Sequence, residues 1–325
     1  MTDIASYIAY LRDVRRYSSR TQILYEDALN NYRSFVASSP QDDSLVEYLI
    51  PSLIREYEGH LIEQGLKPRT VHLQMSALSG YCNYLIKEGI IKSNPVRTVR
   101  RPKMEKRLPE YYTEGAMDAY LEGSEHAESA DELEVLLSTD PKSKLAKELY
   151  NRRLKRMIVS LLYGTGIRRA ELIGLKKESV DLGRQTLHVL GKGDKMREIP
   201  LIPSLIQEIS LYLHAASFMV GEKPANAPLL TTDKGKPLYP AFVDRAVKAE
   251  LQGQKGISGR KSPHVLRHSL ATALLNEGTD LNAIKEMLGH SSLAATEVYT
   301  HNSVERLKAQ YMNAHPRAKN EERND

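Results

Sequence analysis

Cysteine is almost absent from this chain of 325 residues, which contains one, Cys82. A single cysteine excludes a disulfide within the chain, and it also excludes a metal or redox site built on a pair of cysteines. Cys82 lies in the segment GYCNYL, where we expect a small buried core residue.

Long hydrophobic runs are absent as well. No segment approaches the roughly 20 consecutive apolar residues that cross a bilayer, and the segment MTDIASYIAYLRDVRRYSS lacks the basic start and apolar stretch of a signal peptide. We therefore expect a cytoplasmic protein without membrane partners. The length is typical of two domains, since one domain usually spans about 100 to 200 residues.

Basic and acidic residues are distributed unevenly. The net charge is only +5, but residues 110–140 contain ten acidic residues and no Lys or Arg. Residues 101–109 contain four basic residues and one acidic residue, and residues 141–325 contain 30 basic and 19 acidic residues. This basic excess is typical of a protein that binds nucleic acid, although a solvated basic surface has the same composition.

Apolar spacing predicts helices in the first hundred residues, over 20–37, 44–65 with an interruption at Pro51, and 68–89. The following segment, NPVRTVRRPKMEKRLPE, has three prolines, six basic residues and no apolar periodicity, so we predict an extended linker. The expected organisation is a helical domain at 1–100, a basic linker at 101–109 and a second domain at 110–325.

The second domain is predicted to be mainly helical with one small antiparallel sheet. A buried stripe predicts a helix over 147–166 that ends in a glycine turn, and the segment IRRAELIGL begins another. The segment QTLHVLGKGDKMREIPL has extended patterns on both sides of the turn GKGDK, which indicates a β-hairpin with Lys192 at its tip. Three further helices are expected over 264–277, 281–288 and 293–311.

The segment SPHVLRHSLATALL places two histidines and an arginine in the opening turns of a predicted helix. Ser262 is a favourable N-cap, Pro263 suits the first helical position and Gly278 provides a left-handed stop. His264 and Arg267 are three residues apart and are expected to share a face beside the helix N-terminus. That end carries partial positive charge and unpaired N–H groups, so it is a natural place for a phosphate.

Four separated motifs occur in order along the second domain: GTGIRRAEL, GKGDK, HVLRHS and LGHSSLAATEVYTH. Together they resemble the tyrosine recombinase (phage integrase) family, and AHPRAK after the last predicted helix resembles its Xer branch. The segment RTVHLQMSALSGYCNYLIKEGIIKSNP is similar to the α-helical core-binding (SAM-like) domain of that family. The segment of residues 122–145 is longer and more acidic than the corresponding segment of the family. We expect this difference to affect contacts with partners rather than the reaction chemistry.

The resemblance implies a catalytic set whose members are Arg168, Lys192, His264, Arg267, His290 and Tyr299. Tyr299 would attack a DNA phosphodiester and form a 3′-phosphotyrosine, while the two arginines suit the negative charge that develops on the phosphate oxygens. His264 would act as general base, Lys192 would protonate the leaving 5′-oxygen, and His290 would hydrogen-bond the phosphate. No cofactor or metal is expected, because the arginines supply the positive charge.

Each motif alone allows a plainer interpretation. Arg168 and Arg169 could form a surface basic pair, and Lys195 fits the lysine role as well as Lys192 on sequence grounds. Tyr311 lies beyond the motif and is the alternative nucleophile.

His264 and His268 are four residues apart, which is the spacing of zinc ligands on a helix. The segment HVLRH lacks the glutamate that an HExxH hydrolase uses as base, and its arginine would repel a cation. We therefore expect His268 to be structural. Glu171 is expected to support an arginine.

The predicted function is site-specific DNA recombination, in chromosome dimer resolution, DNA integration or inversion. The expected partners are double-stranded DNA with a specific site, further subunits of the same chain or of a paralogous recombinase in a tetramer, and a DNA translocase. The expected location is the nucleoid of a bacterial cytoplasm. The alternatives are a type IB topoisomerase, a non-catalytic DNA-binding regulator and the zinc hydrolase.

Overall fold

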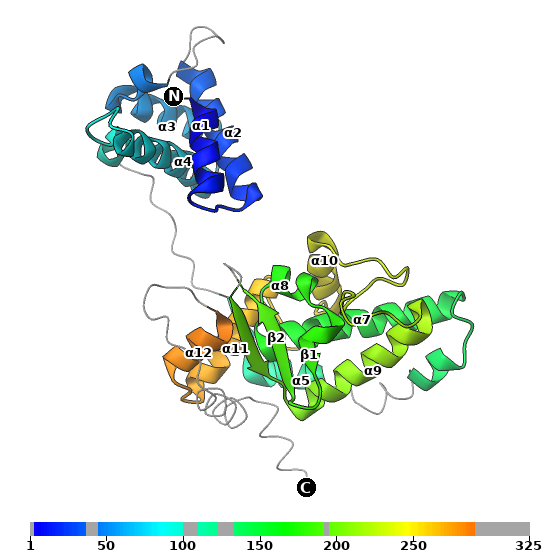
Figure 1. Cartoon of the computed structure of the whole chain (residues 1–325). Coiled ribbons are helices and arrows are strands. Elements are labelled where there is room, and N and C mark those ends of the chain that lie inside the picture. The colour runs from blue at the N-terminus through cyan, green and yellow to red at the C-terminus, as the bar shows by residue number, and fades with distance from the viewer. Residues whose placement is uncertain (1–2, 37–44, 100–109, 123–132, 192–194, 290–325) are drawn as a thin grey trace. The chain divides into compact units, whose positions relative to one another are not determined.

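The chain is described by a computed structural model, which defines residues 3–36, 45–99, 110–122, 133–191 and 195–289. The chain divides into two compact units, Met1–Arg107 and Leu108–Asp325 (Figure 1). Each unit has its own hydrophobic core. The predicted mainly helical, two-domain fold with a small antiparallel sheet is confirmed. The predicted linker at 101–109 and residues 123–132 of the acidic segment lie outside the described residues. None of the described helices is both long and apolar enough to span a membrane.

The described part of the first unit consists of α1 (Ile4–Asp13), α2 (Ser19–Val36), α3 (Pro51–Glu63) and α4 (Pro68–Lys87), with 3₁₀ turns η1 (Val46–Tyr48) and η2 (Pro95–Thr98). Both α3 and α4 begin with a proline, whose missing N–H would have no helical partner in the first turn. The interruption predicted at Pro51 is therefore confirmed. We did not predict α1, although Ile4, Tyr7 and Leu11 have helical spacing and are buried.

The core of the first unit is rich in tyrosine. The rings of Tyr7 and Tyr81 lie 5.5 Å apart between centroids, and those of Tyr32 and Tyr57 lie 5.0 Å apart, both in edge-to-face geometry. Cys82 is fully buried among these residues, as predicted, and burial raises the pKa of its thiol to about 12. The thiol therefore stays protonated at neutral pH and fills space in the core.

The described part of the second unit contains the following elements: α5 (Glu114–Glu122), α7 (Lys144–Thr165), α8 (Arg169–Gly174), η3 (Lys177–Ser179), β1 (Val180–Asp181), β2 (Thr186–Leu190), β3 (Met196–Pro200), α9 (Pro203–Val220), α10 (Pro240–Glu250), α11 (Pro263–Asn276) and α12 (Leu281–Leu288). Helix α7 packs against α9, α10 and α11, so its C-terminal half is buried on all sides. Gly166 ends α7 in the left-handed conformation, with φ of +62°. The predicted glycine turn is therefore confirmed.

The sheet is antiparallel, with strand order β1-β2-β3. Its β2–β3 pairing confirms the predicted hairpin and places Leu187 opposite Ile199 and Val189 opposite Arg197. These four residues are buried, because they lie on the face that packs on the core. Arg197 is therefore a charged residue in an apolar row.

Candidate active site

Helix α11 starts as the sequence predicts, with Ser262 as N-cap and Pro263 in the first turn, but the Ser262 side chain makes no capping hydrogen bond. His264 is exposed, whereas Arg267, one turn later, is only 8% exposed. The two side chains therefore do not share one environment. His264 lies on the surface, and Arg267 points into the molecule.

Arg267 is buried because its guanidinium has carbonyl partners. Nη1 donates to the Gly166 carbonyl at 2.5 Å, and Nη2 donates to the Leu288 carbonyl at 2.7 Å. These bonds join the end of α7 to the end of α12. Burial, together with the nearby guanidiniums of Arg168 and Arg197, lowers the pKa of Arg267 to about 10, so it remains positively charged at neutral pH.

Arg168 approaches the same place from the N-cap of α8. Its Nη2 donates to the Gly289 carbonyl at 2.7 Å, and its Nη1 donates to Glu171 Oε1 at 2.8 Å. About a third of the side chain is exposed, so the guanidinium remains accessible to a ligand. Arg169 instead pairs with Asp244 on α10. The two adjacent arginines thus have different acidic partners, Glu171 and Asp244.

Glu171 accepts four hydrogen bonds, which match the four lone-pair sites of a carboxylate. Oε1 accepts from Arg168 Nη1 at 2.8 Å and from Arg197 Nη1 at 3.1 Å, while Oε2 accepts from the Arg168 backbone N–H and from Arg197 Nη2, both at 2.8 Å. Burial by itself would raise the pKa of Glu171, but these donors and charges lower it below the ordinary value of 4.5. The prediction that Glu171 supports an arginine is confirmed.

Arg197 is the residue that the sequence analysis missed. Its Nε donates to the Met287 carbonyl at 2.8 Å, so three guanidiniums hold three consecutive carbonyls, those of Met287, Leu288 and Gly289. The last carbonyls of a helix have no partner within it and carry partial negative charge, so cations stabilise this end. An arginine in the apolar register of a predicted strand was the available signal for Arg197.

The other predicted site residues lie at the edge of the described structure or outside it. Lys192, His290 and Tyr299 lie outside the described residues. Lys195 is exposed, and its carbonyl accepts the Gly191 N–H at 2.8 Å where the hairpin strands meet. His268 lies with its ring edge-to-face against Tyr111, 6.3 Å between centroids.

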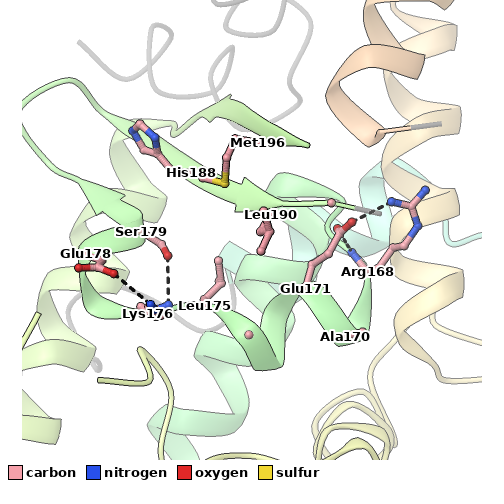
Figure 2. A pocket seen from close by; sticks show the side chains of 12 residues that line it. Arg168, Ala170, Glu171, Leu175, Lys176, Glu178, Ser179, His188, Leu190 and Met196 are labelled. Atoms are coloured by element: carbon pink, nitrogen blue, oxygen red, sulfur yellow. Dashed lines mark hydrogen bonds and ion pairs between the residues drawn. The ribbon is translucent and has the colours of Figure 1, made fainter. Parts of the chain in front are cut away.

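A depression of about 710 Å³ lies beside Arg168. Figure 2 shows Arg168 and Glu171 at one end, Lys176 on the lower side and His188 and Met196 from the hairpin above. Lys176 donates to Glu178 at 3.3 Å, which pairs the two charges within the depression. Of the three clustered arginines, Arg168 lines this depression, whereas Arg197 and Arg267 do not.

Comparisons with known proteins show the family to which the chain belongs. The family model "Phage integrase family" matches residues 129–306, and the model "Phage integrase, N-terminal SAM-like domain" matches residues 4–89. The tyrosine recombinase XerC of Chlorobaculum parvum is 32% identical over 320 residues, which cover 96% of this chain and 94% of that protein. The chain belongs to the phage integrase family of tyrosine recombinases. The predicted resemblance is confirmed.

Two further comparisons extend this assignment. The tyrosine recombinase XerD of Staphylococcus aureus is 31% identical over 318 residues, covering 98% of this recombinase and 99% of the relative. The solved structure of the Tn1549 transposon integrase in complex with transposon right end DNA has a TM-score of 0.64 and 18% identity, over 94% of this chain and 98% of that one. The sequence relatives identify a site-specific recombinase of the Xer type, and the solved structure confirms its fold.

Proposed function

We propose that this recombinase cuts and rejoins duplex DNA at a specific site through a covalent 3′-phosphotyrosine, and that Arg168 and Arg267 grip the reacting phosphate. The convergence of their guanidiniums at the end of α12 carries the proposal. A phosphodiester under attack gains negative charge on its non-bridging oxygens, and preorganised guanidiniums stabilise that charge without moving. Arg168, which is partly exposed, makes the more accessible contact.

The remaining roles are those that the resemblance to the family implies, and they suit the chemistry of the reaction. Tyr299 is the nucleophile, and the exposed His264 on α11 accepts its proton, because a phenol with a pKa near ~10 is mostly protonated at neutral pH. Lys192 protonates the leaving 5′-oxygen as general acid, and His290, which follows Gly289 in the chain, hydrogen-bonds the phosphate.

The proposal extends to partners. The covalent intermediate conserves the energy of the broken bond, so a second strand can be joined without an energy source. We propose a tetramer on two duplexes, made of this chain or of this chain with a paralogous recombinase, and a nucleoid location. The similarity to XerC and XerD supports chromosome dimer resolution, in which a DNA translocase would be a further partner.

The test begins with the unknown target site. The purified recombinase is incubated with sheared DNA of its own host and denatured, and the DNA that remains covalently attached to protein is sequenced. We expect recovered fragments to converge on discrete sites, and we expect Tyr299→Phe to yield none, since it lacks the hydroxyl that attacks. Random recovered sequences would argue against site specificity, and equal recovery with Tyr299→Phe would exclude Tyr299 as nucleophile.

A further inference from the structure

Arg197 is a buried arginine whose three side-chain nitrogens all have hydrogen-bond partners within the second unit. Its side chain is 7% exposed, and the residue opposite it on the neighbouring strand β2 is the buried Val189. A buried ion pair is weak evidence for stability, because an apolar side chain of similar size often serves as well. The apolar residues beside Arg197 on the buried face of the sheet would accept such a side chain. The arginine at this position therefore needs another explanation.

The contacts of Arg197 supply that explanation. All three of its nitrogens donate, Nη1 and Nη2 to the two oxygens of Glu171 and Nε to the Met287 carbonyl. Glu171 in turn holds the backbone N–H and Nη1 of Arg168. The orientation of the exposed Arg168 guanidinium therefore depends on a carboxylate for which Arg197 supplies half of the hydrogen bonds.

Arg197 also sets the place where the chain leaves α12. A Cβ added to Gly289 would lie 3.1 Å from Arg197 Nη1 and 3.2 Å from its Cζ, so the guanidinium packs directly on the Gly289 backbone. The Gly289 carbonyl is the partner of Arg168 Nη2. One buried side chain thus contacts both groups that hold Arg168.

We propose that Arg197 is a positioning residue for strand cleavage, which orients Arg168 through Glu171 and through the end of α12. This inference rests on the proposed function, because it assumes that Arg168 binds the reacting phosphate. Arg197 itself does not touch DNA. Its loss should therefore reduce the rate of cleavage without weakening DNA binding.

The experiment uses a nicked suicide duplex that carries the target site identified by sequencing the covalently attached DNA. The rate constant of covalent attachment is measured in a single turnover at saturating DNA, and Kd is measured separately. Arg197→Met should lower the rate on the order of 10- to 100-fold, since a small misplacement of a catalytic group costs up to about 100-fold, while Kd stays unchanged. Arg184→Met is the matched control, because Arg184 is an exposed arginine at the β1–β2 turn.

A methylphosphonate at the scissile position separates positioning from general damage. This linkage lacks one charged oxygen, so cleavage depends less on a correctly placed Arg168. We expect the defects of Arg168→Met and Arg197→Met to shrink together on methylphosphonate DNA, whereas a merely structural defect would be equal on both substrates. Arg197→Lys provides the same comparison if Arg197→Met does not fold, because lysine keeps the charge but cannot bind a carboxylate through two nitrogens.

The outcomes distinguish this inference from the proposed function. If the unmodified recombinase forms no adduct on the captured site, the proposed function is wrong and the inference falls with it. If it forms an adduct and the Arg197 variants cleave as fast as it does, or lose the same factor on both substrates, only the positioning role of Arg197 is overturned.

Discussion

Among the described residues, Glu171 is the carboxylate that binds the cluster of Arg168, Arg197 and Arg267. It balances part of the repulsion among these three guanidiniums. Its oxygens bind Arg168 and Arg197, and its charge favours the protonated form of Arg267. A buried charge of one sign would otherwise have to be neutralised or hydrated. The cluster therefore stays charged in the absence of DNA because Glu171 and the carbonyls of α12 accept its donors.

The lowered pKa of Glu171 predicts a pH-dependent stability. Glu171 contributes fully above its ordinary pKa of 4.5, and the contribution is lost as the pH falls through its lower pKa in the folded protein. Glu171→Gln should lower the free energy of unfolding by about 3 kcal/mol at neutral pH, because it leaves Arg197 without its ion pair. The difference between the two proteins should shrink towards pH 3 in urea titrations.

The control for this prediction is Glu178→Gln. Glu178 pairs with Lys176, and the side chains of both are half exposed. An exposed pair contributes at most about 1 kcal/mol, so this variant should differ little from the parent protein. A Glu171→Gln deficit that stays constant from neutral pH to pH 3 would contradict the assigned role of the carboxylate.

The elements around the site were predicted better than the contacts among them. Apolar spacing, Pro263 and the GKGDK turn placed α11 and the hairpin, because these signals are local in the sequence. The Arg197 contacts with Glu171 and Met287 join residues 26 and 90 positions apart, and no local pattern indicates them. The motifs predicted that Arg168 and Arg267 act together on a phosphate. They did not predict that the end of α12 would supply the carbonyls between the two guanidiniums.

Gly166 allows the ends of α7 and α12 to meet, and this contact can be tested. A Cβ at Gly166 would lie 2.5 Å from Leu288 Cδ2 and 3.1 Å from Leu270 Cδ2. Gly166→Ala should therefore cost the strain of a left-handed alanine, about 1 kcal/mol, plus about 1 to 3 kcal/mol of overpacking in the core. Urea unfolding of the full chain measures the sum of the backbone strain and the overpacking.

Gly278 provides the matched substitution for this test. It has φ of +79°, but nothing lies within 4 Å of an added Cβ. Gly278→Ala should show the backbone strain without the overpacking, so it should be the milder variant. Equal destabilisation by the two substitutions would mean that the close approach of Leu288 to Gly166 is unimportant.

At the scale of the whole molecule, each unit has its own core, and the basic excess lies in residues 141–325. This basic excess suits phosphate binding, which provides most of the affinity for DNA and weakens steeply with salt. The segment after Tyr299, SVERLKAQYMNAH, has apolar residues at helical spacing but is too short for a stable isolated helix. We predict that it docks on a neighbouring subunit, and a head-to-tail exchange of this kind closes a ring.

Truncation after Asn302 tests this assembly role. The shortened recombinase should still bind one half of the captured site with unchanged affinity, while cooperative binding of a second subunit and all strand exchange are lost. A gel-shift titration on full and half sites measures both steps. Unchanged cooperativity would show that the segment packs on its own subunit.

The most direct test of the account identifies the residue that carries the DNA. The adduct formed with the suicide duplex is digested with trypsin and nuclease, and the peptide that retains a nucleotide is fragmented in a mass spectrometer. Cleavage at Lys285 and Arg306 would place Tyr299 in the peptide of residues 286–306, and Tyr311 would lie in the peptide of residues 309–317. We predict a nucleotide on Tyr299. A nucleotide on Tyr311, or on a serine or threonine of the peptide of residues 286–306, would contradict the account.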